Sequence, residues 1–236
     1  MEIILDRYQI LAVCFVILLI LIIIVLSSKS RIFRTYKKYM KIGNLADITG
    51  KQLAFFSKKK LGLDKLTFAL TDKKLGDAYS PKYKTLILSH EVCDTASLAS
   101  MAIVSHEIGH AMQDHENKPL FNFVRILNRL VDFTNRLILP LLIVGVFFYL
   151  FNFPSENTGY YLIISSIILF VLNIMNQLLH IPIEFDASNR ALKFLKSNNI
   201  LSPSEYRKAK KLLSIAGQTY IAGLFDSLFI LKKRKK

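Results

Sequence analysis

Three long apolar runs constrain the fold of this chain more than any other feature of its sequence. They cover Tyr8 to Ser27, Leu137 to Phe153 and Tyr160 to Leu179. A helix rises about 1.5 Å per residue, so roughly 20 apolar residues cross the ~30 Å hydrocarbon core of a bilayer. Backbone groups in lipid must be paired within their own segment, which favours a helix for each run. The sequence therefore predicts a mainly α integral membrane protein.

Basic residues predict the orientation of these spans. Six of them and no acid lie between Lys29 and Lys41, directly after the first run. Lys and Arg gather on the cytoplasmic side of a membrane, so we expect the N-terminus outside and the next segment in the cytoplasm. We also expect Tyr36 and Tyr39 to lie at the membrane surface as interfacial aromatic residues. A cleaved signal peptide is the alternative for the first run, but acidic residues precede it and no small-residue cleavage site follows.

The net charge of +15 comes with 52% hydrophobic residues, a combination typical of a membrane protein with basic cytoplasmic segments. The basic residues flank apolar runs, and no known nucleic-acid-binding motif accompanies them, so we expect a lipid bilayer and no nucleic acid as partner. The terminal cluster Lys232 to Lys236 would contact anionic headgroups. A helix is predicted to begin at Pro203, because proline suits the first position of a helix. Whether residues 212–231 span the membrane stays open, although Asp226 and the basic flanks favour a helix packed on the soluble part or lying shallowly in the bilayer.

The sequence His-Glu-Ile-Gly-His at residues 106–110 is an H-E-x-x-H motif. On a helix, His106 and His110 lie on one face and can bind one zinc ion. Glu107 is then placed to take a proton from water activated by the metal. The preceding residues contain no Pro or Gly, which predicts a helix from about Thr95 to His115.

A catalytic zinc takes three protein ligands, and the motif supplies two. The candidates for the third are Glu184, His180 and Asp186, directly after the third run. We favour Glu184, because a hairpin of two spans returns the chain to the cytoplasmic face and Pro182 would begin a new helix there. The polar residues at the end of the third run are expected to face the catalytic part: Asn173, Asn176, Gln177 and His180.

Two short strands are predicted before the zinc helix, at Leu66 to Leu70 and Lys84 to Ser89, joined by a segment rich in turn residues. They would form a β-hairpin or small sheet. Its edge could hold a peptide as an added strand, or the hairpin could simply cover the core. The sequence leaves both interpretations open.

The motif at 106–110 with Gln113, and Glu-Phe-Asp-Ala-Ser-x-Arg-Ala-Leu at 184–192, resemble the neutral zinc metallopeptidases of the YugP type. These are membrane-bound zincins similar to the HtpX-like and CAAX-endopeptidase-like gluzincins. The resemblance extends to Asp77, Tyr79 and Pro81 and to residues 217–220. In the broader group the third ligand is the Glu of an E-x-x-A segment, which implies Glu184. Ser188 stands where that group usually has an Asp, so Asp186 is a candidate to orient a ligand histidine.

The predicted fold is a zincin-like metalloprotease domain with helical membrane spans before it and inserted within it. The expected parts are an N-terminal anchor at 1–28, a cytoplasmic zinc-peptidase part at 29–136, a transmembrane hairpin at 137–179, and a third-ligand helix with a C-terminal apolar helix and basic tail at 180–236.

The predicted function is that of a zinc endopeptidase of the plasma membrane with one catalytic zinc. Its substrates would be membrane or membrane-proximal polypeptides at the cytoplasmic face, with Glu107 as general base. Tyr79, Arg190 and Tyr220 are unranked candidates to stabilise the oxyanion. The alternative is a non-catalytic membrane scaffold or chaperone-like protein with a structural or vestigial metal site. An intact Glu107 favours the enzyme, and the oligomeric state stays open.

Overall fold

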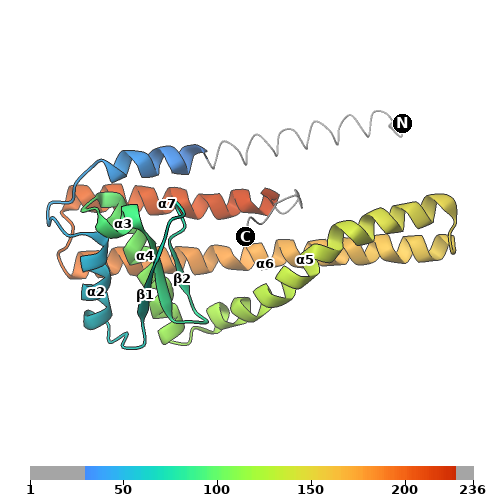
Figure 1. Ribbon diagram of the computed structural model, residues 1–236, viewed down its shortest axis with the longest axis horizontal. Coiled ribbons are helices and arrows are strands. Elements are labelled where there is room, and N and C mark those ends of the chain that lie inside the picture. Colours follow the sequence, from blue (N-terminus) through green and yellow to red (C-terminus); the bar gives the residue numbers. More distant parts are fainter. Residues whose placement is uncertain (1–29, 227–236) are drawn as a thin grey trace, which may run out of the picture.

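The computed structural model describes residues 30–226, without the side chains of residue 156 and residues 216–226. The predicted anchor at 1–28 and the basic cluster at 232–236 therefore lie outside the described residues. The described part is mainly helical, with one small sheet (Figure 1). After a helix over residues 30–40, the elements are α2 (Gly50–Lys60), β1 (Thr67–Thr71), β2 (Ala78–Ser80), β3 (Thr85–Ser89), α3 (His90–Asp94), α4 (Leu98–His115), α5 (Pro119–Phe151), α6 (Glu156–Ser197) and α7 (Pro203–Asp226).

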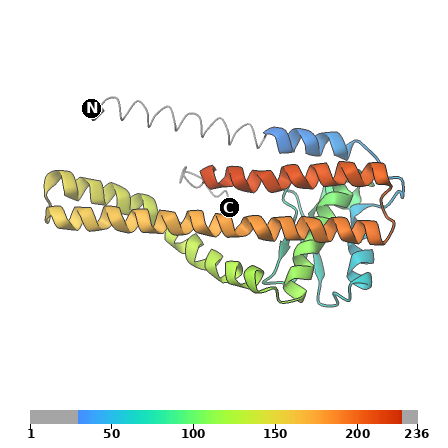
Figure 2. The same ribbon diagram turned by 180° about the vertical axis from the view of Figure 1, so that it is seen from behind.

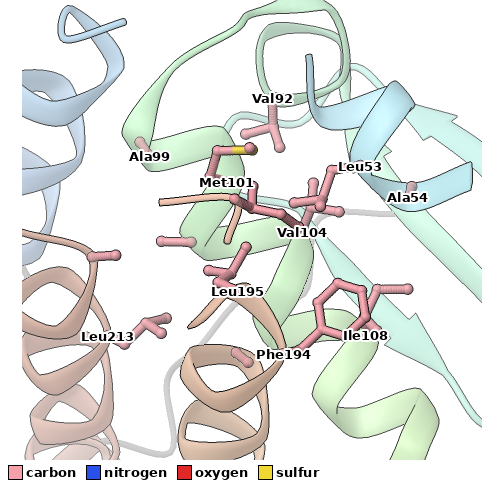
Figure 3. Close-up of a cluster of buried hydrophobic side chains, with 14 of the residues drawn as sticks. Leu53, Ala54, Val92, Ala99, Met101, Val104, Ile108, Phe194, Leu195 and Leu213 are labelled. Carbon is pink, nitrogen blue, oxygen red and sulfur yellow. The ribbon is translucent and has the colours of Figure 1, made fainter. Parts of the chain in front are cut away.

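Helix α4 is the centre of the hydrophobic core and carries the H-E-x-x-H motif. Ser97 caps its first turn by accepting from the backbone N–H of Ser100. Its apolar side chains are buried on nearly every side, as expected of a helix that is apolar all round. Helices α2, α3, α6 and α7 pack around it, and Figure 3 shows side chains from these helices meeting those of α4.

Of the two predicted alternatives, a β-hairpin or a small sheet, the structure has the small sheet. The two predicted strands, β1 and β3, are neighbours, but they run parallel. The segment between them supplies β2, which pairs antiparallel with β3 and gives the order β1-β3-β2. The long connection between the two apolar strands is what allows a parallel crossover, because a parallel pair cannot be joined by a tight turn. Strand β2 is thereby left at an edge of the sheet, in contact with α4.

Helices α5 and α6 form a long antiparallel hairpin that extends away from the core (Figure 1). Within the described residues, two helices are long and apolar enough to cross a membrane, Pro119–Phe151 and Asn157–Ser197. Many large apolar side chains on the hairpin are exposed, among them Phe147, Leu150 and Ile168. Exposed apolar surface of this extent is typical of a membrane-contacting face.

Polar side chains hold the two long helices together. Asn173 donates to Asn135, and Asn176 donates to Asn128 Oδ1 at 2.8 Å. Both α6 residues are buried. The two asparagines therefore face Asn128 and Asn135 of α5, which lie within the predicted zinc-peptidase part at 29–136. Side-chain amides in apolar helices find partners on the neighbouring helix, because nothing else around them can accept or donate.

Helix α6 runs without a break from the hairpin into the core. The prediction that a new helix begins at Pro182 is wrong, because this proline lies in the interior of the 42-residue helix. Proline in a helix interior costs about 3 kcal/mol, and packing on both sides of the position offsets that cost. The segment that carries Glu184 is thus the continuation of a predicted membrane span.

The helix over residues 30–40 packs on the core, which corrects the expectation for its tyrosines. Tyr36 and Tyr39 are buried in the hydrophobic cluster and do not lie at a membrane surface. The Tyr36 hydroxyl donates to Glu91 Oε2 at 3.1 Å. A tyrosine can be buried in this way because its polar end finds a partner while its ring packs.

Helix α7 begins at Pro203, as the sequence predicts, and lies along α6 (Figure 2). Ala209, Leu212 and Leu213 are buried in the core. The first residues of the C-terminal apolar segment, Leu212 and Leu213, therefore pack on the core.

Helices α4 and α6 approach each other with their backbones in near contact at Gly109 and Ala187. A Cβ atom added to Gly109 would lie 2.4 Å from the carbonyl oxygen of Ala187. Ala187 itself is fully buried. Only a residue without a side chain fits at position 109, so the glycine inside the H-E-x-x-H motif is required by the packing of α6.

We expect Gly109→Ala to lower the free energy of unfolding by about 1–3 kcal/mol, because α6 must move away from α4 to make room. Thermal unfolding of the full chain in detergent measures this. Gly43→Ala is the matched control, since its added Cβ would lie an ordinary 3.7 Å from the Ala96 carbonyl oxygen. Equal unfolding temperatures for the two variants would contradict the packing argument.

Candidate metal centre and active site

Helices α4 and α6 bring two histidines and one glutamate together. One ligand atom from each of His106, His110 and Glu184 lies within 4.8 Å of the others. The Nε2 atoms of the two histidines lie 3.0 and 3.4 Å from Glu184 Oε2. His106 and His110 come from adjacent turns of α4, and Glu184 comes from the buried stretch of α6 just before Ala187. Two nitrogen donors and one carboxylate are the donor set of many catalytic zinc sites.

The second ring nitrogen of His110 is held by a network that fixes its tautomer. Gln113 donates its side-chain N–H groups to the Ile183 carbonyl at 2.9 Å and to Asp186 Oδ2 at 2.8 Å. Its amide oxygen must therefore accept from His110 Nδ1, which lies 3.0 Å away. With its proton on Nδ1, the imidazole presents the lone pair of Nε2 to the cluster, as metal binding requires.

Ser188 plays the corresponding part for the other histidine. Its hydroxyl lies 3.1 Å from His106 Nδ1. Ser188 occupies the position at which the broader group usually has an aspartate, so the contact with the histidine is made here by a neutral side chain. A hydroxyl can accept a hydrogen bond from the Nδ1–H group without adding charge to the site.

The cluster stabilises positive charge. Burial alone would lower the pKa of His110, but the hydrogen bond and charge of Glu184, together with the charge of Glu107, raise that pKa to about 9. Burial raises the pKa of Glu107 above its usual value, and the nearby histidines oppose this. The carboxylates thus favour a cation at the histidine nitrogens, and a divalent metal ion supplies one.

Glu107 is held from the edge of the sheet. The backbone N–H of Tyr79, in β2, donates to Glu107 Oε2 at 2.8 Å. The other carboxylate oxygen makes no hydrogen bond to the described residues, and the Glu107 side chain lines a pocket of about 260 Å³. His110 and Glu184 line the same pocket, so the cluster opens onto a cavity between β2, α5 and α6.

A buried aspartate ties the walls of this pocket to α4. Asp114, with a side chain only 2% exposed, accepts from the Tyr79 hydroxyl at 2.6 Å, from Lys84 Nζ, and from Arg125 NH1 at 3.2 Å. Burial and this aspartate raise the pKa of Tyr79, so its hydroxyl stays protonated. The three donors come from β2, from the turn before β3 and from α5.

The other predicted site residues lie around the centre without joining it. His180 lines the pocket and lies 2.9 Å from Asn128 Oδ1, outside the three-residue cluster. Asp186 does not touch a ligand histidine itself and is joined to His110 through Gln113. Arg190 pairs with Asp186 and Glu116. Tyr79 is the oxyanion candidate that lines the pocket, and the side chain of Tyr220 lies outside the described residues.

Sequence reasoning missed the roles of Gln113, Asp114 and Arg125. One signal was available for Asp114, because residues 106, 110 and 114 follow one another at the four-residue spacing of a single helix face. Nothing comparable identifies Arg125, which reads as one basic residue of an amphipathic helix.

We expect Gln113→Leu to weaken zinc binding roughly 10–100-fold, because His110 loses the partner that fixes its tautomer. Competition with a chromogenic chelator measures the affinity. His115→Ala is the control, since His115 is exposed at the end of α4 and should leave the affinity unchanged. Wild-type affinity in the Gln113 variant would show that the network does not support the site.

Comparison with known proteins agrees with this geometry. Residues 14–234 match the model of a family described as "Putative neutral zinc metallopeptidase". A protein of Bacillus subtilis (strain 168), described as "Putative membrane protease YugP", is 30% identical over 201 residues, which are 85% of this chain and 85% of that protein. No solved structure matches the chain. The chain belongs to the neutral zinc metallopeptidase family.

Proposed function

We propose that this protein is a membrane-bound zinc endopeptidase in which His106, His110 and Glu184 hold one catalytic zinc ion. The observation that carries the proposal is the meeting of the two histidines with Glu184 beside a pocket that His110, Glu184 and Glu107 line. When bound, zinc polarises the scissile carbonyl and lowers the pKa of water to near 7. The tautomer of His110, fixed through Gln113, suits such an ion.

Glu107 is the general base of the proposed reaction. Its Oε2 is held by the Tyr79 N–H, which leaves Oε1 to take a proton from the attacking water. The same oxygen then gives that proton to the leaving amine.

The substrate peptide is proposed to lie along the free edge of β2. Tyr79 turns its N–H away from β3 and towards Glu107. In an antiparallel pair, the N–H and C=O of one residue point to the same side, so the Tyr79 carbonyl also faces the pocket and can accept from a peptide N–H. An extended peptide added in this way is held mainly through its backbone.

The site is proposed to act at the cytoplasmic face on membrane or membrane-proximal polypeptides. The pocket lies at the end of the α5–α6 hairpin that joins the core, and the connection between the two helices lies at the other end (Figure 1). Arg129 and Arg136 are exposed on the part of α5 nearer the pocket, while the far connection carries no basic residue. This distribution favours the pocket end as the cytoplasmic end.

The third ligand can be tested by metal content. We expect Glu184→Ala to reduce zinc affinity by more than the roughly 10–100-fold typical of a lost outer partner, because an inner ligand is removed. His180→Ala should retain one zinc per chain, although His180 lines the same pocket. Elemental analysis after dialysis against a weak chelator measures both. Zinc retained in the first variant and lost in the second would reverse the assignment.

The role of Glu107 can be tested by separating binding from catalysis. We expect Glu107→Gln to keep one zinc per chain and to lower cleavage of labelled casein by roughly 10²–10⁴-fold, because the base is removed and the ligands are intact. Removing zinc from the wild type with a chelator should abolish cleavage, and adding zinc back should restore it. Cleavage at the wild-type rate by the zinc-loaded variant would refute Glu107 as the general base. Absence of zinc-dependent cleavage by the wild type would leave the scaffold interpretation standing.

A further inference from the structure

One wall of the pocket carries more positive than negative charge. Lys84 and Arg125 both pair with Asp114, which lies behind the pocket lining, and neither pairs with another acidic side chain among the described residues. Asp114 also accepts from the neutral hydroxyl of Tyr79. Two cations and one carboxylate leave one positive charge at this wall.

The other acidic side chains of the pocket are already engaged. Glu184 lies against the two histidines, and Glu107 accepts from Tyr79. Asp77 accepts from the backbone N–H and the hydroxyl of Ser89. The charges of Glu107 and Glu184 together equal that of one divalent metal ion. Asp77 keeps its own negative charge, because its Ser89 partners are neutral, but it lies at the other end of β2. The surplus positive charge is therefore local to the Asp114 wall and is not a net charge of the whole pocket.

Arg125 is the cation of this wall that lines the pocket itself. Its side chain is 36% exposed, and the bond to Asp114 uses one nitrogen, NH1. A guanidinium group carries five N–H donors in a planar fork that suits a carboxylate. Asp114 is buried and holds this fork from behind, so the group is positioned before any ligand arrives.

We propose that Arg125 binds a carboxylate of the substrate, so that the protein prefers peptides with an acidic group at a fixed distance from the scissile bond. Lys84, with a side chain 40% exposed, adds to the attraction from the same wall. The carboxylate is either an Asp or Glu side chain or the C-terminus of the peptide. This inference rests on the proposed function, because it takes the pocket to be a peptide site.

The location of the wall sets where the acidic group lies. Asp114 lies near the C-terminal end of α4, and Lys84 lies in the turn between β2 and β3. Asp77 lies at the other end of β2, directly before its first residue. A peptide along the β2 edge therefore meets a basic wall at one end and an acidic side chain at the other. Electrostatic complementarity of this kind selects the register of the peptide as well as its composition.

The test measures peptide binding by a variant that is expected not to cleave the bound peptide. The full-length Glu107→Gln chain, loaded with zinc in detergent, is immobilised and exposed to a synthetic peptide library of fixed length. One copy of the library has free C-termini and the other has amidated C-termini, and retained peptides are identified by mass spectrometry. We expect enrichment of acidic peptides. Enrichment in both copies indicates a side-chain carboxylate, and enrichment confined to the free-acid copy indicates the C-terminus.

Matched variants assign the preference to one residue. Retained peptides are resynthesised with Gln for Glu, or with an amidated end, and we expect this change to weaken binding roughly tenfold or more, as for a hydrogen bond to a charged group. In the same background, Arg125→Gln should bring the ratio of the two peptide affinities, acidic over neutral, close to one. Arg125→Lys should keep part of this ratio. Arg129→Gln, one turn further along α5 and exposed, should keep it all. Zinc content and unfolding temperature check that each variant is folded.

Two results would overturn the inference: no preference for acidic peptides in the folded, zinc-loaded protein, or a preference that survives Arg125→Gln. The pairs of acidic and neutral peptides test the preference for acidic peptides without any substitution in the protein at Lys84, Asp114 or Arg125. Cleavage of the library by the wild type is scored separately. Arg125-dependent binding without cleavage would contradict the proposed peptidase function and support this inference. Cleavage with no acidic preference would support the peptidase function and contradict this inference.

Discussion

Contact between the backbones of α4 and α6 at Gly109 and Ala187 is the constraint on which the rest of the structure depends. The two zinc-ligand candidates on α4 are neighbours in sequence, and their relative position needs no tertiary structure. Glu184 must be delivered from another helix, and a side chain at position 109 would hold that helix away. The pair Gly109 and Ala187 therefore fixes the distance between the helices, and the histidine partners Ser188 and Gln113 fix their register.

The polar groups around the centre form a second layer with the same purpose. On one side, Gln113, Asp186 and Arg190 link α4 to α6. On the other, Asp114 links α4 to β2 and to α5. Buried polar groups are costly unless they are all satisfied, and these are satisfied only when the four elements take one arrangement. The network thus specifies the geometry of the pocket more than it adds to stability.

The sequence predicted the zinc helix, the helix start at Pro203 and the segment that meets the motif, because each depends on local chemistry or on a short motif. It failed where tertiary packing overrode a local signal. Pro182 marks a helix start in isolation, but packing on both sides carries α6 through it. Tyr36 and Tyr39 have the neighbours of interfacial residues, yet the core buries them. Asp114 and Arg125 escaped notice because their pairing joins separate elements.

The unbroken course of α6 makes it a lever with its fulcrum beside the metal ligands. Ala187 lies three residues from Glu184, about 4.5 Å along the helix axis, while the far end of α6 lies tens of ångströms away. Membrane helices tilt to match the thickness of the surrounding bilayer. A tilt about this fulcrum sweeps the far end of the hairpin widely and barely moves Glu184. Movement at the far end of the hairpin is therefore strongly reduced at Glu184, because the two lie at very different distances from Ala187.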